Sequence, residues 1–384
     1  MKQKKTFTTI FTDAENFHLV KDVGQLPYFM FKTEGFHSNL VSYKNTESYS
    51  FLNKEVKGLE LTLIPKKGRI FYFEIGILSY LLSHSKTIDV LNLFHFKKGN
   101  FLYLLIYKLL NPKGKSYIKL DMDILFFKKY NSFFFSNYKI KNYFLQILTS
   151  WIFKFTDILS VESEDAKQYL LQVYPELKDK LICIPNGIDD ISIQQEILVK
   201  PYQEKENIIL TVGRIGTDQK NTELLLDALK LIDLKDWKVY IIGPIEEEFK
   251  SHINTFFQEL PQLKDKVIFT GNISDRLELF DWYNKAKIFC LSSRHEGFPI
   301  AFPEALYFGN HIITSPVSSA KHITENGQYG IIAEPTAQDF AMAIQKSIAP
   351  NYLSEEKFRA IRDFSMNNFV WTKIVKKLAE KLNS

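Results

Sequence analysis

The sequence has 384 residues, of which 45% are hydrophobic and 24% are charged. This composition excludes a disordered or fibrous protein, and the length favours two domains over one. Residues 1–150 contain 22 Lys and Arg against 11 Asp and Glu, whereas the remainder contains 27 against 33. The basic first part and the mildly acidic second part therefore predict different partners for each.

The cysteines and apolar runs bear on the compartment. Cys183 and Cys290 lie in apolar, strand-like runs, which predicts buried thiols in a reducing compartment and no disulfide. No sustained apolar region follows the basic residues 1–5, so we expect no signal peptide. The longest uncharged apolar stretches, 99–107 and 142–153, are shorter than the roughly 20 residues that span a bilayer. We expect a cytoplasmic protein, with peripheral attachment to the inner face of a membrane as an open question.

Apolar and amphipathic runs alternate along the first part, as in a parallel sheet covered by helices on both faces. The expected strands are residues 7–11, 37–42, 90–93, 116–120, 158–161 and 180–184. A turn at Pro185-Asn186-Gly187-Ile188-Asp189 follows, and the polar, irregular residues 190–207 suggest a linker.

A second alternating series follows residue 207. The expected strands are residues 208–212, 238–242, 267–269, 287–291, 311–314 and 330–332, and the expected helices are 222–232, 246–257, 276–284, 337–347, 354–364 and 368–382. We predict an α/β protein with two doubly wound Rossmann-like domains, residues 1–190 and 191–365, facing a central cleft. Residues 366–384 would form a helix that crosses back onto the first domain.

The segment from Arg294 to Glu304 is the most informative part of the chain. It links the apolar strand ending at Leu291 to a helix that Pro303 would open and Gly309 would close. A loop between a strand and a helix N-terminus binds anions through unpaired N–H groups. Two carboxylates, Glu296 and Glu304, at the ends of this loop suit hydroxyl groups of a ribose or sugar attached to such an anion. The pattern predicts a nucleotide-sugar site.

A loop of similar character follows the strand that ends at residue 212. Gly213 permits a tight turn, and Arg214 and Lys220 bring two positive charges to the strand's carboxyl end. Such a pair can neutralise a diphosphate. The alternative is that both side chains are ordinary solvated cations.

Taken in order, these motifs resemble the retaining family 4 glycosyltransferases of the GT-B fold. The matching segments are Val212-Gly213-Arg214 with Lys220, Gly271-Asn272-Ile273, Ser292-Ser293 with Glu296-Gly297-Phe298-Pro299, Glu304-Ala305, and Asn326-Gly327 with Gly330. The resemblance covers about residues 155–350. It implies transfer of a sugar from a UDP- or GDP-sugar to a saccharide or lipid-linked acceptor, as in the synthesis of bacterial cell-surface polysaccharide.

The resemblance also implies roles for individual residues. Glu296 would contact the transferred sugar, Glu304 the ribose hydroxyls, and Arg214 and Lys220 the diphosphate. The implied donor-binding set is Gly24, Gly213, Arg214, Lys220, Ile273, Glu296, Gly297, Phe298, Pro299, Ile300 and Glu304. The implied catalytic set is Glu296, Arg214, Lys220 and Asp121. The alternative for the two glutamates is a surface acid and a helix N-terminal acid.

No cluster has metal-ligand spacing, and Arg214 with Lys220 supplies the positive charge. We therefore expect a metal-independent enzyme that needs no cofactor. Two other functions remain open: a sugar-nucleotide epimerase, and a non-catalytic partner of a transferase.

The first domain matches the family poorly. Lys21-Asp22-Val23-Gly24 resembles a loop of some surface-polysaccharide transferases, in which Gly24 would approach the donor diphosphate or the acceptor; the alternative is a turn glycine. Asp121 stands where the family often has a histidine. Three roles remain open for its side chain: to bind a sugar hydroxyl, to accept a proton from the acceptor, or to cap the next segment. His95 ends another strand on the side of the expected cleft. The alternative to a role in the site is an ordinary core or loop histidine.

Lysines and aromatic residues interleave between residues 97 and 154. The lysines are Lys97, Lys98, Lys113, Lys115, Lys128, Lys129, Lys139, Lys141 and Lys154, and the aromatic residues include Phe126, Phe127, Tyr130, residues 133–135, Trp151 and Phe153. This pattern suits an anionic membrane surface. The alternative is an aromatic core with a solvated lysine rim. No nucleic-acid-binding module accompanies the lysines, so we expect no nucleic-acid partner.

Overall fold

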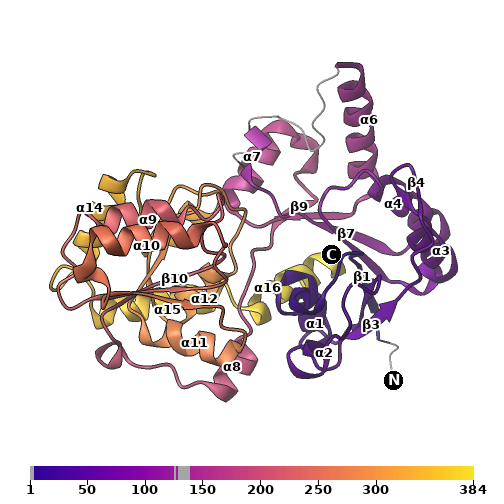
Figure 1. Ribbon diagram of the computed structural model, residues 1–384. Coiled ribbons are helices and arrows are strands. Elements are labelled where there is room, and N and C mark those ends of the chain that lie inside the picture. The colour runs from indigo at the N-terminus through magenta and orange to yellow at the C-terminus, as the bar shows by residue number, and fades with distance from the viewer. Residues whose placement is uncertain (1–3, 125–126, 129–138) are drawn as a thin grey trace. The chain divides into compact units, whose positions relative to one another are not determined.

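The computed structural model describes residues 4–124, 127–128 and 139–384, with the side chains of residues 139–142 left out. The chain forms two compact units (Figure 1). Unit 1 consists of Met1–Asn186 and Trp371–Ser384, and unit 2 of Gly187–Val370.

The described residues of unit 1 contain a parallel sheet of seven strands in the order β3-β2-β1-β6-β7-β8-β9. Their bounds are β1 (Thr6–Ile10), β2 (His37–Ser42), β3 (Glu60–Leu63), β6 (Val90–Phe94), β7 (Lys115–Lys119), β8 (Ile158–Val161) and β9 (Leu181–Cys183). The six expected strands are present within one or two residues. The seventh, β3, lies at the edge of the sheet, and none of its residues is buried. The strand was not predicted, although Leu61 and Leu63 alternate with polar residues, because the run is only four residues long.

Helices and a small hairpin surround this sheet (Figure 1). The helices are α1 (Asp22–Lys32), α2 (Phe51–Lys54), α3 (Ile75–His84), α4 (Asn100–Leu110), α6 (Lys139–Phe155), α7 (Glu164–Val173) and α16 (Trp371–Asn383), with short 3-10 turns η1 (Asn16–Val20), η2 (Ser85–Thr87) and η3 (Pro175–Leu177). The hairpin pairs β4 (Arg69–Ile70) with β5 (Phe73–Glu74).

The C-terminal helix α16 packs on α1 (Figure 1). Its buried residues, Trp371, Ile374, Val375, Leu378, Ala379 and Leu382, recur every three or four positions and form one apolar stripe. The Trp371 ring stacks on Phe29 of α1, with 6.4 Å between the ring centroids. The last 14 residues therefore complete the core of unit 1.

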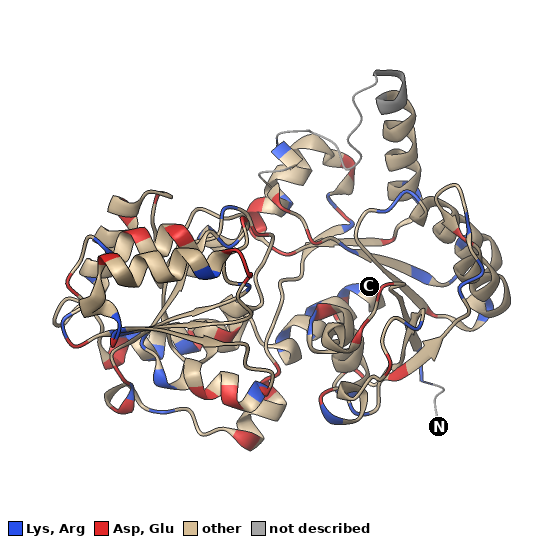
Figure 2. Ribbon diagram, viewed as in Figure 1, with Lys and Arg blue, Asp and Glu red and all other residues tan. Residues whose placement is uncertain are grey.

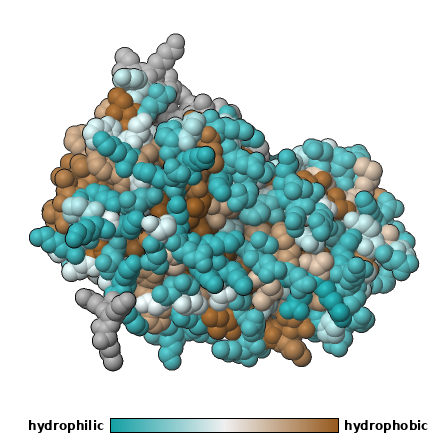
Figure 3. Space-filling model, turned by 180° about the vertical axis from the view of Figure 1, so that it is seen from behind, coloured by the Kyte–Doolittle hydropathy of each residue, from teal (hydrophilic) through white to brown (hydrophobic). Residues whose placement is uncertain are grey.

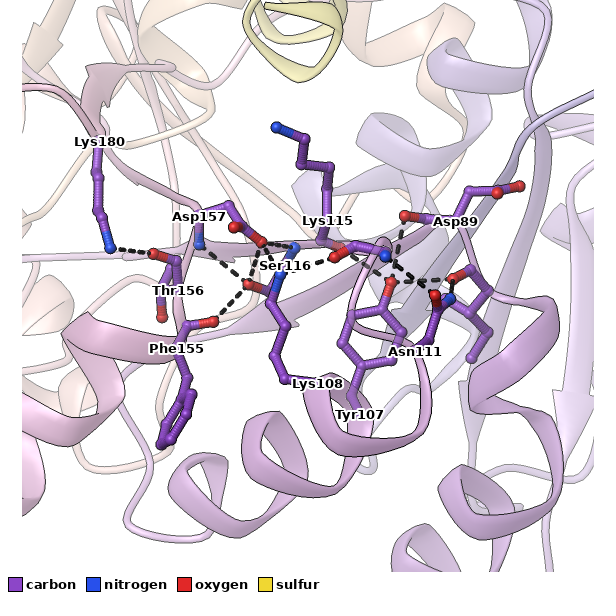
Figure 4. A network of polar contacts seen from close by, with 12 residues as sticks. Asp89, Tyr107, Lys108, Asn111, Lys115, Ser116, Phe155, Thr156, Asp157 and Lys180 are labelled. Carbon is purple, nitrogen blue, oxygen red and sulfur yellow. Dashed lines mark hydrogen bonds and ion pairs between the residues drawn. The ribbon is translucent and has the colours of Figure 1, made fainter.

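A polar network at the amino end of β7 joins α4 to the chain after α6 (Figure 4). The Asp157 carboxylate accepts hydrogen bonds from Lys108 and from the backbone N–H of Ser116, the latter at 2.6 Å. Tyr107 donates its hydroxyl proton to the carbonyl of Ile88 at 2.9 Å. Burial would raise the pKa of Asp157, but Lys108 and Ser116 outweigh it and lower this pKa. Because the network lies at the end of the sheet opposite the expected site residues, we interpret it as structural.

The described residues of unit 2 contain a parallel sheet of six strands in the order β12-β11-β10-β13-β14-β15. The strands are β10 (Ile208–Val212), β11 (Lys238–Ile242), β12 (Val267–Gly271), β13 (Ile288–Leu291), β14 (His311–Thr314) and β15 (Gly330–Ile332). The helices are α8 (Asp190–Glu196), α9 (Thr222–Leu229), α10 (Phe249–Glu259), α11 (Arg276–Lys285), α12 (Ala301–Tyr307), α13 (Ala320–Thr324), α14 (Ala337–Ser347) and α15 (Glu355–Asn368), with 3-10 turns η4 (Tyr202–Glu204) and η5 (Pro261–Leu263).

Both sheets have the doubly wound order 3-2-1-4-5-6 when their strands are counted along the chain, with β9 added as a seventh strand in unit 1. The predicted α/β fold with two Rossmann-like halves is therefore confirmed. Each sheet has a switch point, between β1 and β6 in unit 1 and between β10 and β13 in unit 2. Successive connections leave the sheet in opposite directions there, which opens a crevice at the carboxyl ends of the strands.

Two local predictions were wrong. Residues 190–207 are not an irregular linker, because Asp189 caps α8 by accepting the N–H of Ser192 at 2.8 Å. In the same stretch, the buried Lys205 side chain donates to the carbonyls of residues 283, 284 and 286. Helix α12 begins at Ala301, two residues before Pro303, because the first helical turn tolerates a residue without an N–H group. Gly309, with φ +74°, follows this helix as expected.

Cys290 is buried, Cys183 is half-buried, and both thiols are free. Within the described ranges, every helix is too short or too polar to cross a bilayer.

Stability below neutral pH should depend on His311, the first residue of β14. Among the described residues, neither ring nitrogen of His311 has a hydrogen-bond partner. Burial, with Lys357 and Lys346 nearby, lowers the pKa of His311 from 6.5 to about 3. Because the unfolded chain takes up this proton and the folded chain does not, stability should fall as the pH drops from 6.5 toward 3. The loss should reach on the order of 4 kcal/mol.

Urea unfolding at pH 7 and at pH 5 measures this dependence. The difference between the two pH values should shrink in His311→Leu, whereas His252→Gln, at an exposed position, should keep the wild-type difference. An unchanged difference in His311→Leu would contradict this account.

Candidate functional site

The switch point of unit 2 brings together two loops that are far apart in the sequence. The first follows β10 and contains Gly213 and Lys220; the second follows β13 and contains Glu296. The first loop packs tightly against Gly243, which has φ +146°, and a Cβ atom built there would lie 1.7 Å from the Gly213 carbonyl oxygen. Glycine is therefore required at position 243, and the strand ends are held close together.

Lys220 and Glu296 are in direct contact. The Lys220 Nζ lies 2.6 Å from Oε1 of Glu296, and the Ser293 hydroxyl donates to the same oxygen at 2.8 Å. The Lys220 and Glu296 side chains are only 18% and 9% exposed. The carboxylate is therefore fixed in position while the ammonium retains a path to solvent.

Gln219 extends this contact to Arg214. Its side-chain amide donates to Oε2 of Glu296 at 3.2 Å, and its carbonyl oxygen accepts from the Arg214 guanidinium at 3.0 Å. The backbone N–H of Arg294 donates to the backbone carbonyl of Gln219 at 2.8 Å. Gln219 thus connects three of the predicted site residues, directly or through Glu296. Sequence analysis missed it; the available signal was its position between Arg214 and Lys220.

Glu304 contacts a different partner. It lies on α12, is 4% exposed, and its Oε1 is 3.1 Å from the guanidinium of Arg276. Arg276 is the first residue of α11 and was also missed by sequence analysis. The second predicted carboxylate is therefore held by an arginine from a neighbouring helix, whereas Lys220, Glu296 and Arg214 form one connected group.

The residues between the two glutamates are partly structural. The Phe298 side chain is buried, with its ring centroid 5.8 Å from that of Phe369. Ile273 is half-buried and packs against the same apolar core. Gly297, Pro299 and Ile300 complete the loop that leads into α12. Since the Phe298 side chain faces the core, a ligand bound to this segment would contact its backbone. This agrees with the expectation that the loop binds an anion through N–H groups.

Gly24 in unit 1 is needed for packing. It lies buried in the first turn of α1, and a Cβ atom built there would be 2.3 Å from the Leu19 carbonyl oxygen of η1. This close approach explains the glycine without a ligand and favours the structural alternative. The donor role of Gly24 stays a prediction.

A largely buried ion cluster lies next to Gly24. Lys119, the last residue of β7, donates to Asp22 at 2.9 Å, to Glu162, and to Asn186 at 3.0 Å. Burial would lower the pKa of Lys119, but Asp22 and Glu162 outweigh it and raise this pKa. Lys119 in turn outweighs burial and lowers the pKa of Asp22, whereas burial raises that of Glu162. The cluster ties α1 to β7, to the end of β8 and to Asn186.

His95 and Asp121 lie at the same edge of this sheet. His95 has φ +60°, and its backbone N–H donates to the Lys119 carbonyl at 2.9 Å. Burial lowers the pKa of His95, while Asp121 and then Asp22 oppose that change. Asp121 is exposed. The histidine and the two aspartates therefore interact. This is expected, because the carboxyl ends of neighbouring parallel strands lie side by side.

In the ranges that the structure describes, no three His, Cys, Asp or Glu side chains are grouped so that they could hold a metal ion.

Removing the Lys119 charge should destabilise unit 1. Lys119→Met leaves two buried acids without their cation, which typically costs about 3–5 kcal/mol. Lys115→Met, at the exposed opposite end of β7, is the matched control and should change stability by less than about 0.5 kcal/mol. Urea unfolding measures both variants.

A second substitution separates charge from packing. Adding Glu162→Gln to Lys119→Met should recover part of the lost stability, because one uncompensated acid is removed. If Lys119→Met unfolds at the wild-type urea concentration, the cluster does not have the importance assigned to it.

Comparison with known proteins supports an assignment for unit 2. Residues 193–360 match the family model described as Glycosyl transferases group 1. A probable sucrose-phosphate synthase of Thermosipho melanesiensis is 28% identical over 59% of this chain and 54% of its own length. An alpha-1,4-N-acetyl-D-galactosaminyltransferase of Campylobacter jejuni is 29% identical over 54% of this chain and 53% of its own length. The chain spans about half the length of these curated relatives.

Solved structures extend the likeness to nearly the whole chain. A glycosyltransferase from Rickettsia africae is 18% identical, with a TM-score of 0.75 over 99% of this chain and 98% of its own. HepE from Anabaena, solved with UDP and glucose, is 14% identical, with a TM-score of 0.69 over 99% of both chains. At these identities the likeness shows the fold alone. The family model therefore covers part of unit 2, and the solved structures agree with a fold of two Rossmann-like domains.

Proposed function

We propose that this chain is a retaining glycosyltransferase that moves a sugar from a UDP- or GDP-sugar to a saccharide or lipid-linked acceptor. The observation that carries the proposal is the 2.6 Å contact between Lys220 and Glu296 at the switch point of unit 2. Doubly wound sheets bind their ligands at such a point. A cation for the diphosphate and an acid for the sugar therefore lie side by side.

The roles follow from the charges. As the bond to the donor sugar breaks, positive charge develops on the sugar ring and negative charge on the leaving diphosphate. Arg214 and Lys220 would stabilise the diphosphate, and Glu296, held by Ser293 and Gln219, would face the transferred sugar. Arg276 would orient Glu304 toward the ribose hydroxyls.

Because two cations already serve the leaving group, we propose that the reaction needs neither a metal ion nor a cofactor. Asp121 remains a candidate to bind an acceptor hydroxyl or its proton, since its exposed side chain interacts with His95 at the carboxyl edge of the unit 1 sheet.

The acceptor class has two candidates. The name of the Campylobacter jejuni relative specifies a saccharide on PP-undecaprenol. The names of the Thermosipho melanesiensis relative and of a mannosylfructose-phosphate synthase from Agrobacterium fabrum specify sugar phosphates. We propose a lipid-linked acceptor in cell-surface polysaccharide synthesis, with a soluble sugar phosphate as the second candidate.

Exposed apolar side chains on unit 1 support the lipid-linked candidate. On α6, Tyr143 is 68% exposed, Phe144 63% and Trp151 43%, and the Lys154 ammonium lies 5.2 Å from the centre of the Trp151 ring. Figure 2 shows the described part of α6 almost without charged residues, and hydrophobic residues gather at the left of Figure 3. An apolar helix face beside Lys154 suits the boundary of an anionic bilayer.

The sequence did not separate core from surface in this region. Phe127, Ile152 and Phe153 are buried, so part of the aromatic run belongs to the core. Phe126, Lys129, Tyr130 and residues 133–135 lie outside the described residues, as do the side chains of Lys139 and Lys141. The proposed cytoplasmic location with attachment to the inner membrane face rests on the exposed α6 residues.

Calorimetry with UDP and GDP tests the donor site. Arg214→Ala and Lys220→Ala should each weaken binding of the preferred nucleotide about 10- to 100-fold, because each removes a charged hydrogen-bond donor to the diphosphate. Glu296→Gln should retain nucleotide binding but lose sugar transfer. Lys238→Ala, at the exposed opposite end of the sheet, is the matched control.

The same assays separate the competing functions. Transfer that persists in chelator fits the metal-independent reaction, whereas loss restored by a divalent ion would contradict it. Wild-type nucleotide affinity in both the Arg214 and Lys220 variants would remove the proposed diphosphate site. An epimerised nucleotide-sugar as product would replace the transferase with an epimerase.

Flotation with phosphatidylglycerol vesicles tests the membrane surface. Most of the protein should float at low salt and detach at high salt, because lysine attraction to the headgroups is screened. Phe144→Ser with Trp151→Ser should abolish flotation, while Leu198→Ser, an exposed position in unit 2, should not. Equal flotation of both variants would place membrane binding elsewhere.

A further inference from the structure

Unit 1 has a cavity at its own switch point. The cavity measures about 390 Å3 and is lined by residues that end β1 and β6, by the β4–β5 hairpin and by the start of α4. Small-molecule sites typically measure about 300–1,000 Å3. Since β1 and β6 are the strands between which the order of the sheet reverses, the cavity lies where a doubly wound sheet binds its ligand.

Three cations line this cavity, from two separate segments. Arg69 belongs to the hairpin, and Lys97 and Lys98 follow β6. Two acids are also present: Glu74 lies 3.2 Å from Arg69, and Asp13 lies 3.3 Å from Lys97. The Arg69 and Lys97 side chains are 64% and 47% exposed, so these ion pairs are weak and can rearrange around a ligand. The lining has an excess of positive charge.

Two helix N-termini add to the positive potential. Helix α3 begins after Glu74 and α4 begins after Gly99, and both of these residues line the cavity. Neither N-terminus is capped by a side chain of its preceding residue. A Cβ atom built on Gly99 would lie 2.7 Å from the Tyr72 carbonyl oxygen, so only glycine lets this loop approach the hairpin. The backbone N–H groups and the three cations therefore border the same space.

The remaining wall is aromatic. Phe11, Phe94 and Tyr103 line the cavity, and the Lys98 ammonium lies 4.8 Å from the centre of the Tyr72 ring. The Tyr103 hydroxyl accepts a hydrogen bond from the Glu74 backbone N–H at 2.9 Å, which holds the hairpin against α4. Aromatic faces beside polar groups suit a sugar ring, whose C–H faces are apolar and whose rim is polar.

We propose that this cavity binds the phosphoryl group of the acceptor, with Arg69 and Lys98 as its main charged contacts and the acceptor sugar against the aromatic wall. The inference rests on the proposed glycosyl transfer and specifies the acceptor as a phosphate ester. The same chemistry has two sources, a soluble sugar phosphate and a lipid-linked diphosphate, and each offers an anion next to a sugar or lipid.

Calorimetry on the full chain without donor tests this site. The probes are glucose 6-phosphate against glucose, and phosphatidylcholine vesicles with undecaprenyl diphosphate against vesicles without it. One of the two phosphate probes should bind, and its unphosphorylated partner should bind at least 10-fold more weakly. Binding of glucose 6-phosphate identifies a soluble acceptor, and binding of the vesicles that contain diphosphate identifies a lipid-linked one.

Variants locate the binding. Arg69→Gln with Lys98→Gln should weaken the phosphate probe at least 10-fold, and Lys115→Gln, at the amino end of the sheet, should leave it unchanged. Both substituted positions are partly exposed, and thermal melting verifies that the double variant is folded. Failure of both phosphate probes, or wild-type affinity in the double variant, would overturn the proposal.

A parallel measurement separates this proposal from the proposed transferase function. UDP and GDP binding, measured on the same samples, reports on the unit 2 site. Nucleotide binding that is lost in Lys220→Ala but kept in the Arg69 and Lys98 variant shows that the two sites are separate. If the wild type binds neither nucleotide, the proposed transferase function is wrong. The phosphate probes and the Arg69 and Lys98 variant then still decide whether the unit 1 cavity binds a phosphoryl group.

Discussion

The parallel alignment of the strands brings together the charged side chains of the loops that follow them. In a parallel sheet all carboxyl ends lie at one edge, so loops that are distant in the sequence become neighbours there. In unit 2 this places Lys220, which follows β10, 2.6 Å from Glu296, which follows β13. In unit 1 it places Asp22, His95 and Asp121 within electrostatic reach of one another. An antiparallel arrangement would have sent alternate loops to opposite ends.

Two lysines at such strand ends illustrate how burial separates a structural from a functional charge. Lys119 is completely enclosed and contacts two acids and an amide, so no ligand can reach its ammonium. Lys220 keeps 18% of its side chain exposed and has one acidic partner. A buried ammonium must be neutralised inside the protein, whereas a partly exposed one can exchange its partner for a ligand. Only Lys220 is therefore suited to a diphosphate.

The sequence predicted the alternation of strands and helices because buried parallel strands are short apolar runs bounded by turns. Strands β2 and β8 were predicted to the residue. The edge strand β3 was missed although Leu61 and Leu63 alternate with polar residues, and the β4–β5 hairpin was missed because each of its strands has only two residues. Residues 190–207 were misread because polarity was taken for irregularity, although Asp189 is a recognisable helix cap.

The candidate site was predictable only where single residues carry charge at a strand end. The spacing of Arg214, Lys220, Glu296 and Glu304 indicated a nucleotide-sugar site before any contact was known. The partners that orient these residues, Gln219 and Arg276, were missed, because each lies on another loop or helix from the glutamate that it contacts. For Gln219 the only signal was its position between Arg214 and Lys220. The unit 1 cavity was missed for the same reason: its lining comes from three separate segments, residues 10–13, 69–77 and 93–103.

Both proposed phosphate-binding regions place acids beside their cations, which at first sight opposes anion binding. Lys220 contacts Glu296, Arg69 contacts Glu74, and Lys97 contacts Asp13. Cations clustered without acids would repel one another. Their long side chains would also stay mobile until the ligand bound, so that their loss of rotamer freedom would weaken binding. A neighbouring carboxylate holds each cation near its working position and offers an acceptor for sugar hydroxyls. The pairing of acids with cations therefore fits a ligand that is both a phosphate and a sugar better than it fits a bare anion.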